Sequence, residues 1–115
     1  MNGNSLFVDT NILLYFLKFD SQIVEMISDK NLILSVISEI ELLSFPDLGK
    51  LEEDLINEFL DNCVVFDLSL DIKGLAIRLR KKYKLKLPDA IIAASAINLN
   101  IPLLTSDKGL ERLKN

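Results

Sequence analysis

The chain has 115 residues, of which 50% are hydrophobic and 26% are charged, a composition typical of one globular domain with a single core rather than of a disordered chain. It has no histidine and one cysteine, Cys63, which excludes a Ser-His-Asp or Cys-His nucleophile and a structural zinc site. The net charge of −4 is unevenly distributed, because residues 1–71 hold three basic and fourteen acidic side chains, whereas residues 72–115 hold ten basic and three acidic ones.

The first half of the chain alternates short apolar runs with helical patterns. A strand is predicted over residues 6–8, a helix over 12–17, and a second helical pattern over 20–28, where apolar residues recur at helical spacing. The apolar run over residues 31–35 predicts a second strand, and the apolar stripe over 36–45 predicts the helix that follows it.

The second half continues the alternation after a break at Pro46 and Gly49. The predicted elements are, in order, a helix over 51–60, a strand over 64–68, helices over 70–83 and 88–98, a strand over 101–106 and a helix over 108–114. The helix over 88–98 is almost uncharged beyond its first turn and begins with Pro88, where a missing N–H costs nothing.

Strands that alternate with helices predict an α/β fold, with a mostly parallel sheet of four or five strands and helices on both of its faces. The strands are apolar without alternation, which agrees with a sheet that is covered on both sides. In such sheets ligands bind outside the carboxyl ends of the strands, so polar residues at that edge are the first candidates for a site.

The sequence shows no sign of export or of membrane insertion. Its N-terminus lacks a basic region followed by an apolar one and a cleavage site. The longest uncharged run contains Asn98, Asn100 and Pro102, which is typical of buried protein rather than of a membrane span. We therefore expect one cytoplasmic domain over residues 1–115.

Four acidic residues fall at the predicted carboxyl edge of the sheet. Asp9 directly follows the first strand, and Asp107 follows the fourth. Glu41 lies about two turns into the helix after the second strand, and Asp89 lies in the first turn of the uncharged helix. That helix and the strand after it both span about 16 Å, so the chain should return Asp107 to the neighbourhood of Asp89.

Each acid also has a structural explanation. Asp9 and Asp107 could cap a turn or a helix, and Asp89 could favour a helix N-terminus by its charge alone. Periodicity does not choose between Glu41 and the nearby Glu39, since both have apolar neighbours. The convergence of four acids on one edge nevertheless favours a site over four separate structural roles.

Clustered carboxylates without histidine suit hard divalent cations such as Mg²⁺ or Mn²⁺, which would also offset the repulsion between the acids. Such an ion supports phosphodiester hydrolysis, because it activates a water and shields the leaving oxygen. A basic segment near the acids could then contact phosphates, or could simply be a solvated helix end. Its members are Arg78, Arg80, Lys81, Lys82, Lys84 and Lys86.

The chain resembles the PIN-domain ribonucleases, and most closely their small single-domain toxin members of the VapC type. The resemblance rests on three segments in order: FVDTNILLYFL, LSVISEIELL and LPDAIIAASAINLNIPLLTSDKGL. It implies a three-layer α/β/α sandwich and an endoribonuclease that uses Mg²⁺ or Mn²⁺. The catalytic and metal-binding residues that it implies are Asp9, Glu41, Asp89 and Asp107.

The resemblance adds details that the residues alone do not provide. The spacing from Ser35 assigns the second acid to Glu41 rather than Glu39. The polar residues that it implies as supports for the acids or for waters are Asn11, Ser38, Thr105 and Ser106. Such toxins usually dimerise and are inhibited by a small antitoxin, so a homodimer and an antitoxin partner are implied as well.

Two other functions remain open from the sequence. A phosphatase or phosphoacceptor domain would use Asp9 as a nucleophile, although the phosphatase version usually has a second Asp two residues on, where this chain has Asn11. A non-catalytic PIN-like module would bind RNA or protein without cleaving anything.

Overall fold

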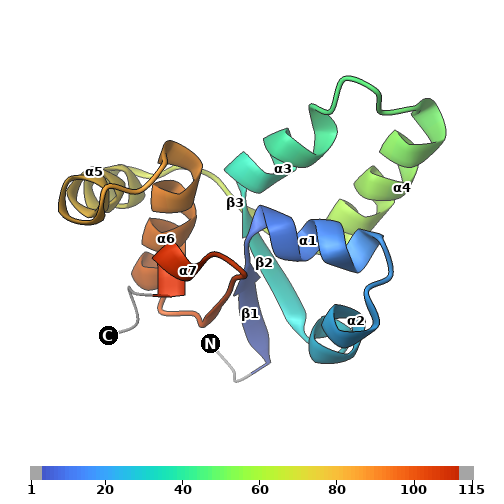
Figure 1. Cartoon of the computed structure of the whole chain (residues 1–115), viewed down its shortest axis with the longest axis horizontal. Coiled ribbons are helices and arrows are strands. Elements are labelled where there is room, and N and C mark those ends of the chain that lie inside the picture. Colours follow the sequence, from blue (N-terminus) through green and yellow to red (C-terminus); the bar gives the residue numbers. More distant parts are fainter. Residues whose placement is uncertain (1–3, 112–115) are drawn as a thin grey trace.

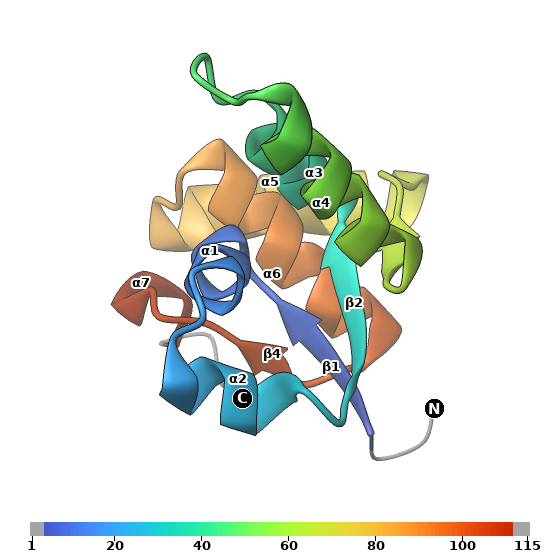
Figure 2. The same ribbon diagram turned by 90° about the vertical axis from the view of Figure 1, so that its right-hand side faces the viewer.

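Four parallel strands form the sheet in the part of the chain that the structure, a computed structural model, describes, residues 4–111. The strands are β1 (Ser5–Val8), β2 (Asn31–Ser35), β3 (Val64–Phe66) and β4 (Leu103–Leu104), in the spatial order β3-β2-β1-β4. Figure 2 shows β2, β1 and β4 side by side. All pairings are parallel, so the carboxyl ends of the strands share one edge, as predicted.

Helices cover both faces of this sheet (Figure 1). They are α1 (Thr10–Leu17), α2 (Ser21–Ile27), α3 (Val36–Leu43), α4 (Lys50–Asp61), α5 (Leu70–Tyr83), α6 (Leu87–Leu99) and α7 (Lys108–Glu111). Helices α1, α2 and α4 lie on one side of the sheet, and α5 and α6 lie on the other. The result is an α/β/α arrangement, which confirms the predicted fold class.

The alternation of side chains along the strands explains the two layers of core. Val8 and Leu34 are fully buried and pack with residues of α1, α2 and α4. Phe7 and Ile33 point to the other face and pack against Ile92 of α6 and its neighbours. Both faces of the sheet are therefore buried, which is why its strands carry apolar residues at successive positions.

Helix α6 lies between the sheet and α5. Its residues 90–96 are all buried, and it packs on the sheet through one side and on α5 through the other. A helix that is apolar all round is the expected consequence of contact on both sides. The chain leaves α6 through Asn100, which adopts a left-handed backbone with φ 56° and ends the helix.

Several predicted boundaries differ from the structure. The strand predicted over 101–106 is regular only at Leu103–Leu104, because Pro102 has no N–H to donate and contributes only its carbonyl, which accepts from the Phe7 amide at 2.8 Å. The strand predicted over 64–68 ends at Phe66, and the helix predicted over 36–45 ends at Leu43, just before Pro46.

The closing helix predicted over 108–114 is α7 as far as Glu111, and the rest of that prediction lies outside the described residues. A fifth strand, which the prediction left open, is not found within residues 4–111. Among the helices that the structure describes, none is long and apolar enough to cross a membrane.

Candidate metal centre

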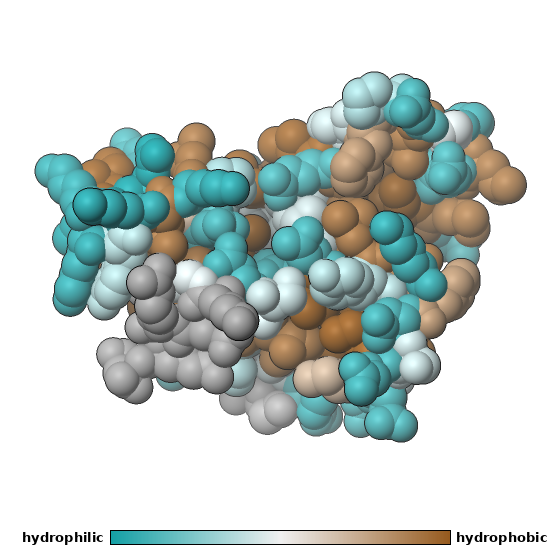
Figure 3. Space-filling view, viewed as in Figure 1, coloured by the Kyte–Doolittle hydropathy of each residue, from teal (hydrophilic) through white to brown (hydrophobic). Residues whose placement is uncertain are grey.

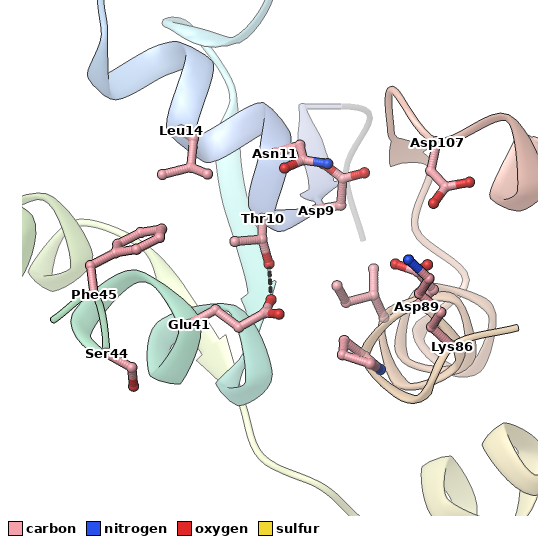
Figure 4. A pocket seen from close by; sticks show the side chains of 12 residues that line it. Asp9, Thr10, Asn11, Leu14, Glu41, Ser44, Phe45, Lys86, Asp89 and Asp107 are labelled. Carbon is pink, nitrogen blue, oxygen red and sulfur yellow. Dashed lines mark hydrogen bonds between the residues drawn. The ribbon is translucent and has the colours of Figure 1, made fainter.

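A pocket with a volume of about 590 Å³ opens at the carboxyl edge of the sheet (Figure 4). Its lining comes from the starts of α1 and α6, from α3 and from the segment after β4. The lining residues are Asp9, Thr10, Asn11, Leu14, Glu41, Ser44, Phe45, Lys86, Pro88, Asp89, Ile92 and Asp107. All four predicted acids therefore line one pocket, whereas Glu39 does not.

Asp9 is the N-cap of α1 and is held at both carboxylate oxygens. Its Oδ1 accepts a hydrogen bond from the Ile12 amide at 2.9 Å, and its Oδ2 accepts one from the hydroxyl of Thr105. The residue is only 4% exposed. Capping, the structural explanation considered above, thus accounts for one oxygen of Asp9, and the second oxygen is fixed by a residue 96 positions away.

Thr105 connects the acid after β1 to the acid after β4. Its hydroxyl donates to Asp9 and accepts from the Asp107 amide at 2.9 Å. The Asp107 carboxylate in turn accepts from the Gly109 amide at 2.7 Å through Oδ1. One threonine therefore links the Asp9 carboxylate to the backbone at Asp107, a position consistent with the supporting role predicted for it.

Glu41 is held by a chain of hydroxyl groups. The hydroxyl of Thr10 donates to Glu41 Oε1 at 2.5 Å, and the hydroxyls of Thr10 and Ser38 lie 2.8 Å apart. Since Thr10 has one hydroxyl hydrogen and gives it to the carboxylate, Ser38 must donate to Thr10. Ser38 is fully buried, so the base of this chain is fixed by the packing of α3.

Thr10 was not among the predicted site residues, although it follows Asp9 directly. Its partner Glu41 is 31 positions away, and no pattern within one helix or strand reveals such a pair. Of the remaining predicted supports, Asn11 lines the pocket and is exposed. Ser106 is exposed and lies outside the pocket lining.

Asp89 shows the electrostatic character of the pocket. Burial, followed by repulsion from Asp107, the hydrogen bond to Asp107 and the charge of Asp9, raises the pKa of Asp89 from 3.8 to about 6, and Lys86 opposes this shift. Burial, and after it the negative charge of the neighbouring acids, therefore makes ionisation of Asp89 unfavourable. A bound cation would offset the repulsion between these acids.

The donor set of the pocket fits a hard divalent cation. It offers carboxylate oxygens from Asp9, Glu41, Asp89 and Asp107, and no nitrogen or sulfur ligand. Within residues 4–111, no three acidic or thiol side chains lie close enough together to enclose one ion. Mg²⁺ commonly uses only one or two carboxylates and completes its shell with waters and substrate oxygens, so the pocket suits that mode of binding.

The raised pKa of Asp89 predicts a pH dependence of stability in the absence of divalent cations. Between its ordinary value of 3.8 and about 6, the folded chain holds this proton more tightly than the unfolded chain. Through this group, the free energy of unfolding therefore falls as the pH rises across that window and stays lower above it. Urea unfolding from pH 3.5 to 7 should show this fall as a difference between wild type and Asp89→Asn. Parallel pH profiles for the two proteins would contradict it.

Comparison with known proteins identifies related domains. The family model described as the PIN domain matches residues 6–115. A solved structure described as a toxin–antitoxin complex from Klebsiella pneumoniae contains a chain 28% identical to this one, with a TM-score of 0.80. That match covers 89% of this chain and 86% of the other. No curated protein sequence matches the chain.

Two further structures share the fold at lower identity. VapBC-1 from nontypeable Haemophilus influenzae contains a chain with a TM-score of 0.81 and 24% identity, over 95% of this chain and 92% of that one. VapBC2 from Rickettsia felis, bound to a DNA fragment from their promoter, contains one with a TM-score of 0.78 and 22% identity, over 94% and 92%. All three similarities extend over nearly the full length of both chains.

Proposed function

The chain belongs to the PIN-domain family, and we propose that it is a metal-dependent endoribonuclease that acts as the toxin of a toxin–antitoxin pair. The observation that carries this proposal is the convergence of four carboxylates on one pocket at the carboxyl edge of the sheet. Three of the acids are close enough to interact, as the raised pKa of Asp89 beside Asp107 and Asp9 indicates. The substrate is RNA, and the cofactor is Mg²⁺ or Mn²⁺.

In this proposal, one or two of the carboxylates of Asp9, Asp89 and Asp107 would bind the cation directly and the rest would act through its waters, while Glu41 would orient the attacking water. When bound, the ion makes a coordinated water more acidic and offsets charge at the reacting phosphate. The protein fixes Asp9 through Thr105 and the start of α1, and it fixes Glu41 through Thr10. Because these hydrogen bonds are already formed, the two carboxylates need little rearrangement when the substrate binds.

The position of Asp9 speaks against its use as a nucleophile in a phosphatase or phosphoacceptor domain. A nucleophilic carboxylate needs an oxygen that is exposed to the substrate, so that the phosphorus can approach it in line. Both oxygens of Asp9 accept hydrogen bonds, and the residue is almost fully buried. Each oxygen keeps a second lone-pair site, so Asp9 can cap the helix and still serve as a cation ligand, which does not need the exposure that a nucleophile needs.

The basic segment is proposed to contact the RNA backbone. All six of its side chains are exposed, and hydrophilic residues gather over α5 in Figure 3. Lys86 lines the pocket itself, beside the acids. Arg80 has a partly structural role, because its Nε donates to the Leu85 carbonyl at 3.1 Å and secures the turn after α5. Lys81 and Lys82 lie outside the pocket lining and add positive charge to the exposed surface of α5.

The double substitution Lys81→Glu with Lys82→Glu should weaken RNA binding and make its salt dependence less steep. The negative slope of log affinity against log salt should decrease in magnitude by about 1 to 2, because up to two phosphate contacts are lost. A filter-binding series over several salt concentrations measures both quantities. The matched control is Lys18→Glu with Lys50→Glu, which makes the same change in net charge on exposed residues of the acidic half. An unchanged slope in the first variant would show that the basic segment is a solvated helix end that does not contact RNA phosphates.

An antitoxin partner and a homodimer complete the proposal. The support for the partner is the similarity to chains solved as toxin–antitoxin or VapBC complexes. Co-expression with a candidate antitoxin protein, followed by gel filtration, tests the partner. Sedimentation of the chain by itself tests the dimer.

The function is tested by offering the purified chain both RNA and a small phosphate monoester with Mg²⁺. The proposal expects internal cleavage of RNA and no release of phosphate from the monoester. Phosphate release that depends on Asp9 would instead support the phosphatase alternative. RNA binding without cleavage, under conditions in which the protein is folded, would support the non-catalytic module.

A further inference from the structure

One side of the pocket is apolar and is not used by the chemistry described so far. Leu14 of α1 and Phe45, two residues after the end of α3, form this side (Figure 4). Asp9, Thr10 and Glu41 lie between them and the side occupied by Asp89, Asp107 and Lys86. Phe45 is 48% exposed, so an aromatic ring faces solvent beside the acids. What distinguishes Phe45 from the other exposed phenylalanine, Phe19, is that its ring lies in the lining of the pocket, where it offers a flat apolar face to a ligand.

The backbone under Phe45 is fixed by a turn. Its carbonyl accepts a hydrogen bond from the Leu48 amide at 3.1 Å, which closes a β-turn with Pro46 at its second position. A residue that precedes proline is also restricted to extended backbone, so Phe45 cannot continue α3. Leu48 packs against the core cluster under α1 and α4. The turn and the packing of Leu48 therefore define the backbone position from which the Phe45 side chain extends.

The three parts of the pocket match the parts of a nucleotide. Carboxylates that hold a cation suit the phosphate being cleaved, Lys86 suits a neighbouring phosphate, and an exposed aromatic ring suits a nucleobase. We infer that Phe45 stacks on an unpaired base of the RNA substrate, next to the phosphate that lies at the acids. This inference rests on the proposed function, and it adds a base-binding subsite to it.

The subsite predicts the kind of specificity that the protein has. A base can lie on Phe45 only if it has left its helical stack, so single-stranded or looped RNA is favoured over duplex RNA. Stacking is tolerant of sequence, because every base has a π-face. Phe45 therefore selects for unpaired structure at the cleavage site and leaves the identity of the base largely open.

Binding of a short unstructured RNA with a single 2-aminopurine tests the inference, since stacking on an aromatic ring quenches that fluorophore. Ca²⁺ replaces Mg²⁺, and a gel confirms that the RNA stays intact. Phe45→Ala should weaken binding about fivefold or more and abolish the quenching, whereas Phe45→Tyr should preserve both. Phe19→Ala is the matched control, because Phe19 is an exposed phenylalanine outside the pocket lining, and it should change neither quantity.

Unchanged affinity and quenching in Phe45→Ala would overturn the inference. The same conclusion follows if Phe45→Ala alters only the affinity for a partner protein, since Phe45 would then belong to a protein contact. Because the binding experiment does not depend on cleavage, a failure of the proposed function can be distinguished from a failure of this inference. If the wild-type chain quenches the fluorophore but never cleaves RNA with Mg²⁺ or Mn²⁺, the base-binding subsite is supported and the proposed nuclease activity is contradicted.

Discussion

Replacement of Asp89 by asparagine should lower the rate of RNA cleavage by about 10³-fold or more, equivalent to about 4 kcal/mol of transition-state stabilisation. Asparagine has nearly the same shape but no charge to hold a cation beside Asp107 and Asp9. The same substitution should raise the midpoint of thermal unfolding at pH 7 without divalent cations. Burial and the neighbouring acids disfavour the charge of Asp89, and the variant removes that charge. Cleavage assays and thermal unfolding on the same preparations measure the two effects.

Asp71→Asn is the matched control for Asp89→Asn. Asp71 also lies in the first turn of a helix, α5, but it is exposed and outside the pocket lining. It should lose a small favourable interaction with the helix dipole and leave cleavage unchanged. If Asp89→Asn behaves like Asp71→Asn, with full cleavage and slightly lower stability, then Asp89 serves only its helix.

Substitutions of Asp9 should separate its two roles. Asp9→Ala removes the cap of α1 and the partner of Thr105, so it should lower the free energy of unfolding by about 1 to 2 kcal/mol and also abolish cleavage. Asp9→Asn keeps a good capping side chain, so it should cost less stability and still abolish cleavage. Urea unfolding and RNA cleavage, measured for both variants, distinguish the roles.

Asp20→Ala provides the comparison for the cap alone. Asp20 caps α2, where its Oδ1 accepts from the Ile23 amide at 3.2 Å, and it is exposed and outside the pocket lining. Its loss should cost about 1 kcal/mol of stability or less and leave cleavage intact. Asp9→Asn with wild-type cleavage would show that Asp9 is a structural cap, as Asp20 is.

The order of strands and helices could be predicted because each element carries its own pattern. The apolar runs of β1 and β2 and the uncharged length of α6 are visible in sequence, since each element is buried on two sides. The ends of the helices and strands were harder to predict, because each end depends on single residues and on their neighbours in the fold. Pro102 shortens β4 by lacking an N–H, and α3 ends at Leu43, before Pro46.

Topology predicted part of the site, and the family resemblance supplied the choice of Glu41 and the polar supports. A parallel sheet brings the residue after each strand to one edge, so the neighbourhood of Asp9 and Asp107 follows from the order of elements. Periodicity could not separate Glu41 from Glu39, and the structure places only Glu41 in the pocket lining. The hydrogen bond from Thr10 to Glu41 and the position of Phe45 depend on how α1 packs beside α3. No pattern within either helix predicts that packing.

The central claim is that these carboxylates cleave RNA through a bound divalent cation. It is tested most directly by removing metal from the purified chain with EDTA, separating the chelator by gel filtration, and adding back Mg²⁺ or Mn²⁺ in steps while RNA cleavage is measured. We expect cleavage to be lost on depletion and restored by either ion in the wild type, but not in Asp89→Asn purified in parallel. Cleavage that persists in EDTA, or that either ion restores equally in Asp89→Asn, would contradict the account.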